Sequence, residues 1–312
     1  MQTASCPEVS VVIPVYNDPN GIRTTVRSVV EQNCDPENFE ILVVDNGSTD
    51  RTPETVATLA AEHDIVTALS EPSIQSSYAA RNRGIEAARG EILAFIDADM
   101  WVSEDWIETV TNTMRRNDCE YAGCAVEVTT QSAKPTLAAQ YNISTGFPVE
   151  TYLNEGNFAP TGCLVTYSWV FEEVGLFEET MISSGDKEFG QRVHAHGIKQ
   201  CFLREITVYH PARNSVIDLC AKAYRIGRGS TQLARHSTPT HQATTDAHKQ
   251  TNGSIFQSLN QILPVVPLEF YIRHREQIDV PTSRMLLLDL IHQIQFICQL
   301  VGRIDEWRRK CV

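Results

Sequence analysis

The sequence lacks several features that would assign the protein to well-known classes. It has no C-x-x-C pair and no cysteine beside histidine at zinc-finger spacing, which argues against a structural zinc site. It has no uninterrupted apolar run of about 18 residues, so no membrane-spanning helix is expected. Its first residues lack the basic and apolar regions of a signal peptide. We therefore expect reduced thiols for the cysteines, which are Cys6, Cys34, Cys119, Cys124, Cys163, Cys201, Cys220, Cys298 and Cys311.

Positive charge is also scarce. The chain has 26 Lys and Arg residues, only 6 of them lysine, against 39 Asp and Glu, for a formal net charge of −13. This balance argues against a nucleic-acid-binding surface and against electrostatic adhesion to anionic lipid. An acidic, lysine-poor composition suits a high-salt cytoplasm and is equally common among mesophilic proteins. With 312 residues and 42% hydrophobic content, the chain suits one large domain, alone or with an appendage.

Strands alternate with helices in the first half of the chain. Short apolar runs predict buried strands at Val9–Val15 and 40–44 and a further strand from residue 92. Helical spacing predicts helices at 24–32, at 53–63 with Thr52 as N-cap, and at 77–89 with Gly90 as C-cap. This alternation indicates βαβ units, and hence an α/β fold with a mainly parallel sheet.

The second half is less regular. Strands are expected at 120–129, 158–165 and 201–209, and helices at Ser168–Val174, 185–197 and 284–303. The polar stretch 231–254 is a candidate linker or mobile loop. The last helix has two interpretations that we leave open. It either packs on the main domain or a partner subunit, or lies in the plane of a membrane.

Two carboxylates follow the apolar run that begins at residue 92. Asp97 and Asp99 are spaced i and i+2, so on a strand they would point the same way and could converge on one cation. Mg²⁺ and Mn²⁺ bind one or two carboxylates together with substrate phosphates. On its own this triplet is weak evidence, because D-x-D is common in exposed turns.

Polar residues suited to a nucleotide follow three of the predicted strands, and an Arg-Asn-Arg-Gly segment lies before the third. This order resembles the family 2 glycosyltransferases of the GT-A fold, including those of archaeal and bacterial cell-surface glycan synthesis and protein glycosylation. The resemblance covers about residues 9–228. The residues that carry it are Pro14, Tyr16, Asn17, Asp45, Gly47, Ser48, Arg81, Asn82, Arg83, Gly84, Asp97 and Asp99.

The resemblance implies a fold and a domain division. We expect a GT-A domain at 1–230, a Rossmann-like mixed and mainly parallel sheet flanked by helices. Residues 1–119 would form its nucleotide-sugar half and residues 120–230 its acceptor half. Residues 231–312 would form a polar loop and a C-terminal helical extension.

The resemblance also implies how the donor is bound. Asp45 would accept a hydrogen bond from the ring N–H of uracil or guanine, and Gly47 would let the backbone turn beneath the nucleotide. Arg81 would lie near the ribose or diphosphate, where a guanidinium can bind phosphate oxygens. The remaining contacts to the base and ribose would come from Pro14, Tyr16 and Asn17.

For the metal, the resemblance implies Asp99 as first ligand, while Asp97 would contact the ribose and help to hold the ion. His210 follows the last strand and would complete the shell, which favours Mn²⁺ over Mg²⁺. Arg225 and Arg228 would form either a mobile cover over the phosphates or a solvated basic turn.

The general base is implied by the segment that begins at Gly185, which resembles the family's E-D-x-E-L motif. Asp186 takes the position of the Asp that deprotonates the acceptor hydroxyl, and Glu188 is the second choice. Gly185 replaces the first acidic residue of the motif, so the motif is incomplete. An Asp at this place also has an ordinary role as a helix N-cap.

These expectations together predict a metal-dependent, inverting glycosyltransferase. It would move one sugar from a UDP- or GDP-linked donor to a hydroxyl acceptor, with a lipid-linked glycan as one candidate. The Q-x-x-R-W motif of processive synthases is absent, so one transfer per encounter is expected. The protein would be cytoplasmic, with possible peripheral contact to the inner face of the membrane, and its oligomeric state is open. The alternatives are a sugar-nucleotidyltransferase and a catalytically silent protein that binds nucleotide-sugars.

Overall fold

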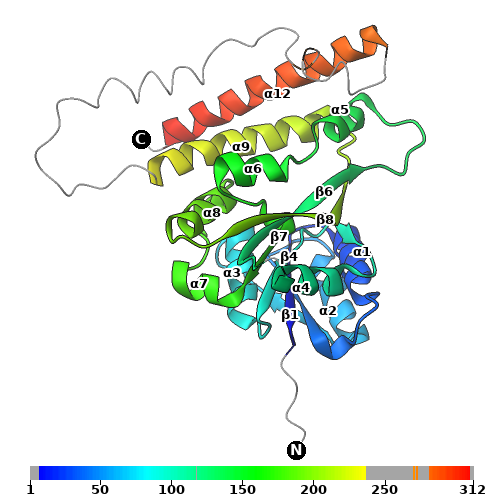
Figure 1. The fold of residues 1–312 in the computed structure, drawn as a ribbon. Coiled ribbons are helices and arrows are strands. Elements are labelled where there is room, and N and C mark those ends of the chain that lie inside the picture. The colour runs from blue at the N-terminus through cyan, green and yellow to red at the C-terminus, as the bar shows by residue number, and fades with distance from the viewer. Residues whose placement is uncertain (1–6, 117, 237–269, 271, 273–280, 310–312) are drawn as a thin grey trace, which may run out of the picture. The chain divides into compact units, whose positions relative to one another are not determined.

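The computed structural model describes residues 7–116, 118–236, 270, 272 and 281–309. Within them, eight strands form one mixed sheet in the order β3-β2-β1-β4-β7-β6-β8-β5 (Figure 1). The strands are β1 Val9–Val15, β2 Phe39–Asp45, β3 Val66–Ser70, β4 Ile92–Phe95, β5 Trp101–Val102, β6 Tyr121–Thr129, β7 Leu164–Tyr167 and β8 Gln200–Pro211.

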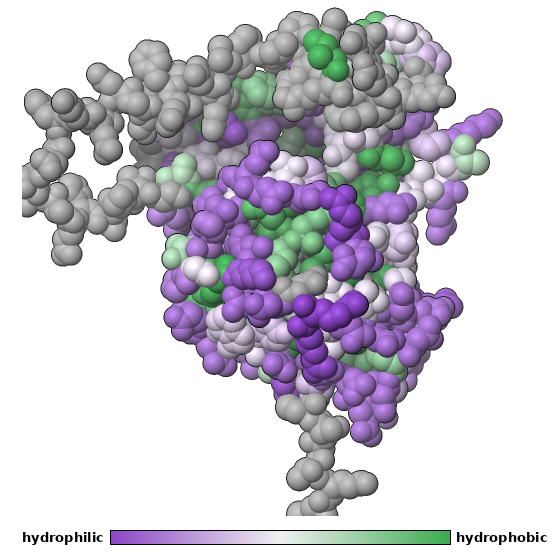
Figure 2. Space-filling model, in the orientation of Figure 1, coloured by the Kyte–Doolittle hydropathy of each residue, from purple (hydrophilic) through white to green (hydrophobic). Residues whose placement is uncertain are grey.

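The helices that accompany this sheet lie between its strands in the sequence. They are α1 Pro19–Val30, α2 Thr52–Glu62, α3 Ser77–Ala87, α4 Trp106–Arg116, α6 Val149–Gly156, α7 Ser168–Val174 and α8 Gly185–Ala195, with the 3₁₀ turns Pro36–Asn38 and Thr161–Cys163. Every residue of β1 and β2 is buried, as expected of parallel strands covered on both faces. In Figure 2, hydrophilic residues dominate the molecular surface around the position of α2.

The parallel pairing sets where the polar strand ends meet. β1 pairs in parallel with β2 and β4, and the register places Val15 beside Asp45. The carboxyl ends of these three strands therefore share one edge of the sheet. β8 pairs in parallel with β6 and antiparallel with β5, which aligns Tyr209 with Trp101.

Several sequence predictions need correction at helix ends. α1 begins at Pro19 and not at residue 24, because the Asp18 side chain accepts the Gly21 N–H at 2.8 Å and caps the helix. Thr52 is not an N-cap; it is the first residue of α2, and its N–H donates to Asp50 Oδ1 at 2.9 Å. Gly90 is not a C-cap, since α3 ends at Ala87 and the Gly90 N–H donates to Ser10 Oγ at 2.8 Å.

The strand predictions are closer, with three exceptions. The two-residue strand β5 was not expected. β3 was not expected, because it lies at the sheet edge with mostly exposed residues and lacks an apolar run. The strand expected at 158–165 is instead a 3₁₀ turn at Thr161–Cys163 followed by β7. Cys119 and Cys201 form a disulfide, which corrects the expectation that all thiols are reduced. Cys6 and Cys311 lie outside the described residues.

The chain divides into two compact units. The first comprises residues 1–134 and 145–212, and the second comprises 135–144 and 213–312. The expected domain boundary at residue 230 stays a prediction. The second unit contains α5 Leu137–Thr145, α9 Val216–His236 and α12 Thr282–Arg309. α9 occupies the place where a basic turn or cover was predicted, and it includes 231–236 of the predicted polar loop. The rest of that loop lies outside the described residues.

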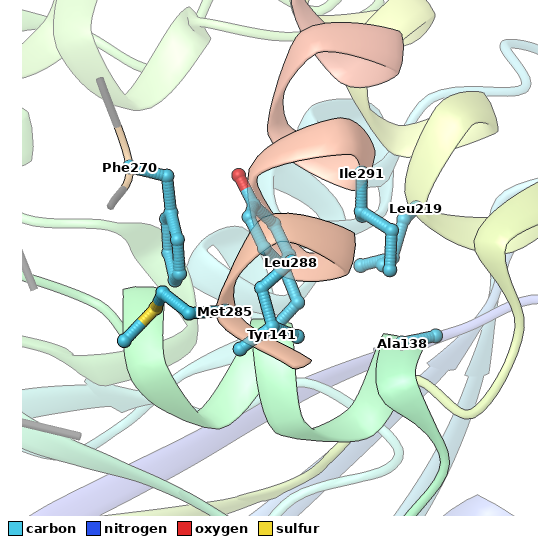
Figure 3. Packing of buried hydrophobic residues seen from close by; sticks show 7 residues of the cluster. All are labelled: Ala138, Tyr141, Leu219, Phe270, Met285, Leu288 and Ile291. Atoms are coloured by element: carbon cyan, nitrogen blue, oxygen red, sulfur yellow. The ribbon is translucent and has the colours of Figure 1, made fainter. Parts of the chain in front are cut away.

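The second unit has its own hydrophobic core. Figure 3 shows its side chains pointing toward one another from α5, α9, α12 and Phe270. α9 and α12 lie side by side (Figure 1), and a Cβ at Gly227 or Gly302 would collide with the backbone of the other helix. The core consists of Ala138, Tyr141, Leu219, Phe270, Met285, Leu288 and Ile291.

Candidate active site

The loops after β1 and β2 are joined by side-chain hydrogen bonds. The Asn17 N–H donates to Ser48 Oγ at 2.9 Å, and the Thr49 N–H donates to Asn17 Oδ1 at 2.8 Å. Asn17 adopts a left-handed φ of 51°, and Gly47 has a φ of 73°, a conformation that favours glycine. These contacts hold the two strand ends together as one rim.

Four predicted nucleotide contacts lie at this rim, and a fifth, Pro14, lies beneath it. Asp45 is buried at the end of β2, and its carboxylate accepts the Ser48 N–H at 3.3 Å. Tyr16 is 47% exposed, so its ring is available to a planar ligand. Pro14 is buried within β1 and not on the rim surface. The structure thus brings Tyr16, Asn17, Asp45 and Gly47 together.

Arg81 and Asp97 form an ion pair at the next strand end. The Arg81 side chain is almost fully buried, and its Nη2 donates to Asp97 Oδ1 at 2.5 Å. The Asp97 side chain remains 44% exposed. A buried guanidinium that holds a partly exposed carboxylate presents a mixed positive and negative surface to a ligand. Arg83, four positions before the end of α3, is exposed, and its Nη1 lies 3.7 Å from Glu86 Oε2.

Asp97 and Asp99 do not share the strand geometry expected from the sequence. β4 ends at Phe95, and the Met100 N–H donates to Asp97 O at 3.1 Å, so the two carboxylates lie in a turn. Thr25 of α1 anchors this turn by donating to Met100 O at 2.6 Å. In the described part of the chain, no group of three or more His, Cys, Asp and Glu side chains is arranged to hold a metal ion.

Asp99 instead faces His210. Asp99 Oδ2 lies 4.0 Å from His210 Nε2, and the His210 side chain is buried. His210 Nδ1 is 2.7 Å from the Pro211 carbonyl, which can only accept, so we assign the proton to Nδ1. With the proton on Nδ1, Nε2 of a neutral His210 could bind a cation together with the Asp99 carboxylate, whose Oδ2 is 4.0 Å away.

Asp186 is the second residue of α8 and is partly buried. The loss of water around its carboxylate raises its pKa above the ordinary value. The Lys187 N–H, at 2.9 Å from Oδ1, and the Arg81 charge oppose this change, whereas Asp97 adds to it. Asp186 is therefore close enough to Arg81 and Asp97 to interact with both electrostatically. A carboxylate with a raised pKa is suited to accept a proton.

Three other predicted residues lie elsewhere. Glu188 accepts from Arg192 at 2.7 Å, so its carboxylate is engaged within α8. Arg225 and Arg228 lie on α9 in the second unit, and Arg228 Nη2 is 2.8 Å from the buried carboxylate of Glu306. Their proposed contact with phosphates stays a prediction.

Sequence reasoning missed two residues beside Asp186. The Tyr78 hydroxyl accepts the Gly185 N–H at 2.9 Å, and Arg81 lies over the Tyr78 ring. The buried Cys163 thiol has a raised pKa, first through burial and then through Cys124, Asp97 and Asp186. Tyr78 lies three residues before Arg81, a spacing that places both on one helix face, and this signal could have identified it.

Comparison with known proteins decides the family. The model of "Glycosyl transferase family 2" matches residues 10–168, which include the rim, α3 and both carboxylates of the D-x-D triplet. The chain belongs to glycosyl transferase family 2. This glycosyltransferase is 35% identical to glycosyltransferase AglE of Haloferax volcanii over 231 residues, 74% of this chain and 75% of that protein. It is 41% identical to the putative glycosyltransferase EpsH of Bacillus subtilis over 107 residues, 34% of this chain and 30% of that protein.

Solved structures confirm the predicted fold of this glycosyltransferase. The mannosyltransferase PcManGT from Pyrobaculum calidifontis, solved with GDP-Man and Mn²⁺, superposes with a TM-score of 0.63 at 17% identity, covering 96% of this chain and 88% of that one. TarS 1–349 from S. aureus, solved with UDP-GlcNAc, gives 0.54 at 14% identity, covering 97% and 92%. The mixed sheet flanked by helices is thus the GT-A fold.

Proposed function

We propose that this glycosyltransferase transfers one sugar from a UDP- or GDP-linked donor to a hydroxyl acceptor, with inversion and with a divalent metal ion. The observation that supports the proposal is that α3, which holds the Arg81–Asp97 pair, contacts the start of α8, where Asp186 lies: the Tyr78 hydroxyl accepts the Gly185 N–H at 2.9 Å. The pKa of Asp186 is raised, first by burial. This arrangement suits a site where a base and a diphosphate meet.

In this reaction Asp186 takes the proton of the acceptor hydroxyl. The hydroxyl oxygen attacks the anomeric carbon from the side opposite the diphosphate, and the nucleoside diphosphate leaves with the electrons of the broken bond. A single displacement inverts the anomeric configuration. General base catalysis of this kind contributes about 10²–10⁴ in rate.

The rim and α3 would bind the donor. Asp45 would accept the base's ring N–H, and the exposed ring of Tyr16 would lie against the base or ribose. The buried Arg81 would keep Asp97 oriented toward the ribose. Because Arg81 is already held by the fold, little side-chain entropy is lost when it meets a phosphate.

Asp99 and His210 would bind the divalent ion through the Asp99 carboxylate and His210 Nε2, which lie 4.0 Å apart. A bound Mn²⁺ or Mg²⁺ would neutralise charge on the leaving diphosphate. Two protein ligands suffice when diphosphate oxygens and water complete the shell. PcManGT, whose fold is similar, was solved with Mn²⁺.

The acceptor proposal rests on α12. By length and composition this helix could cross a membrane: its most apolar 18-residue window has a mean hydropathy of 1.5, and 28% of that window is buried. One side of the helix packs on α9, with Gly302 and Glu306 buried, which favours a helix lying in the membrane plane over one that spans it. The exposed apolar residues of α12 are Leu286, Leu287, Leu290, Ile297, Val301, Ile304 and Trp307.

This apolar face is bordered by the exposed residues Arg284, Arg308 and Arg309. Trp307, which is 60% exposed, has the amphipathic ring that prefers the lipid headgroup region. We infer that α12 lies on a bilayer and that the acceptor is a lipid-linked glycan. Ile297→Gln with Val301→Gln should abolish flotation with anionic liposomes while leaving transfer to a water-soluble acceptor intact. Flotation equal to that of the parent protein would contradict the membrane contact.

A donor screen tests the catalytic proposal. The purified protein is incubated with UDP-, GDP- and dTDP-sugars and Mn²⁺ or Mg²⁺, at low and at molar KCl, and released nucleoside diphosphate is measured. We expect metal-dependent release from one donor and its loss in Asp186→Ala and Asp99→Ala. Donor binding without any release, even with acceptors present, would favour a silent nucleotide-sugar-binding protein. No donor binding would refute the proposal.

A further inference from the structure

The N-terminus of α8 is capped from another helix. Ser184, the residue before α8, has a left-handed φ of 66° and no side-chain hydrogen bond to the helix. The first N–H groups of a helix need acceptors from outside it. Here the Gly185 N–H donates to the hydroxyl of Tyr78, 107 positions away in sequence, at 2.9 Å.

The same tyrosine explains why Gly185 replaces the acidic residue of the resembling motif. A Cβ at position 185 would lie 2.8 Å from Cε2 and Cζ of Tyr78, closer than real Cβ contacts. Tyr78 is buried, 5% exposed, and its ring packs against Phe177 at 5.9 Å between centroids, so it has little freedom to move away. The ring therefore fills the space that a side chain at position 185 would need.

Tyr78 also connects the base to the donor side. It lies one turn before Arg81 on α3, and Arg81 holds Asp97. The residue before α3, Ser76, donates to Met181 O at 3.3 Å, so α3 binds the segment before α8 at a second point. One short helix thus contacts both sides of the site.

We propose that Tyr78 is a positioning residue that caps α8 and fixes Asp186 relative to the Arg81–Asp97 pair. This inference rests on the proposed role of Asp186 as general base. The phenol acts through the Gly185 N–H and need not touch substrate. Burial raises the pKa of Tyr78, so the hydroxyl stays protonated and neutral throughout the working pH range.

The test compares Tyr78→Phe with Tyr121→Phe. Tyr121 is also a fully buried tyrosine, and its hydroxyl accepts the N–H of Ala159 at 3.0 Å, so both variants lose a buried hydrogen bond of the same kind. We expect Tyr78→Phe to lower kcat about 10- to 100-fold at unchanged donor Kd. The acidic limb of its pH profile should move to lower pH, because the released Gly185 N–H turns to the Asp186 carboxylate and favours its charged form. Tyr121→Phe should keep kcat and the limb.

Equal kcat and equal pH limbs in the two variants would overturn the inference. Asp186→Asn is assayed alongside: if it keeps full activity, the proposed base itself is wrong, whatever Tyr78 does. If Tyr78→Phe does not fold, Gly185→Ala replaces it. That variant should also lower kcat at unchanged donor Kd, since the added methyl collides with the fixed Tyr78 ring and pushes the start of α8 away from it. A parental kcat would refute the role of Tyr78.

Discussion

Charged side chains are concentrated in two regions of the molecule, and the pKa of an aspartate is changed in opposite directions in the two. In the α3–α8 region of the first unit, burial raises the pKa of Asp186 despite the nearby Arg81. In the α9–α12 helix pair of the second unit, Asp305 accepts from Tyr224 and from Arg309 at 3.0 Å, and its pKa is lowered by these partners. The fold thus disfavours the charged form of Asp186 and favours the charged form of Asp305.

The helix pair continues this pattern along its length. Glu306 is buried, and its carboxylate accepts from Arg228 at 2.9 Å and from Gln232 at 3.2 Å. The Glu306 carboxylate is thus paired within the protein and has little left to offer a ligand. The α3–α8 region has the opposite character, and functional sites are where strained protonation equilibria tend to be found. The difference teaches that a cluster of charged side chains alone does not indicate a functional site. A carboxylate whose burial is not offset by its hydrogen-bond and charge partners is the better indicator.

The largest expected effect is a difference in kcat between variants of Asp186 and Asp305. Asp186→Asn should lower kcat by about 10²–10⁴ with donor Kd unchanged, because the amide cannot accept the hydroxyl proton. Asp305→Asn, the matched change in the helix pair, should leave kcat as it is. Steady-state kinetics and donor titration of both variants provide the measurement. Similar losses in both would remove the distinction between the regions.

The next effect concerns the facing pair of Asp99 and His210. Asp99→Asn or His210→Gln should weaken the apparent Mn²⁺ affinity, measured from metal-dependent activity, by about 10–100-fold. A chelator should abolish activity in the parent protein, and added Mn²⁺ should restore it. Glu188→Gln serves as control, since this carboxylate is engaged with Arg192. Unchanged metal dependence in both site variants would refute the assigned ligands.

A third experiment decides what Arg228 does. Because its partner Glu306 is buried, Arg228→Met should leave that carboxylate without its strongest partner and reduce the free energy of unfolding by about 2–3 kcal/mol. Urea unfolding and donor KM are measured together, with Arg225→Met as control. A raised donor KM with unchanged stability would instead favour the sequence prediction that Arg228 contacts phosphates.

Much of the first unit could be predicted because its information is local. β1 begins and ends at the predicted residues, since the buried parallel strand is an unbroken apolar run. β3 escaped prediction because its side chains are mostly exposed, so its assignment depends on pairing with β2. α9 escaped because its two central glycines suggest a turn, whereas Gly227 is required by the close approach of α12.

The candidate site divides in the same way. The rim and α3 were found because the strand ends and the Arg-Asn segment are contiguous motifs. The different partners of Asp97 and Asp99 could not be predicted, because they depend on a turn that α1 anchors through Thr25. Tyr78 was missed because its partner, Gly185, is distant in sequence.

The smallest expected effect is on thermal stability: Asp186→Asn and Asp305→Asn should change Tm in opposite directions. A raised native pKa means that the folded protein binds the Asp186 proton more tightly than the unfolded chain. Stability is therefore lost as pH rises from the ordinary Asp pKa of about 3.9 through the raised value. Asp186→Asn should remove this penalty and raise Tm at pH 7 by roughly 2 °C, with a smaller gain toward pH 4.

For Asp305 the native pKa is lowered, so its contribution is present above the ordinary Asp pKa and is lost as pH falls through the lowered value. Asp305→Asn should then lower Tm at pH 7, opposite in sign to Asp186→Asn. Thermal unfolding of both variants at pH 7 and at pH 5 measures the pair. If Asp186→Asn lowers Tm as Asp305→Asn does, the partners of the Asp186 carboxylate outweigh its burial in the folded state. The two regions would then not differ in their effect on stability, even if they differ in their effect on kcat.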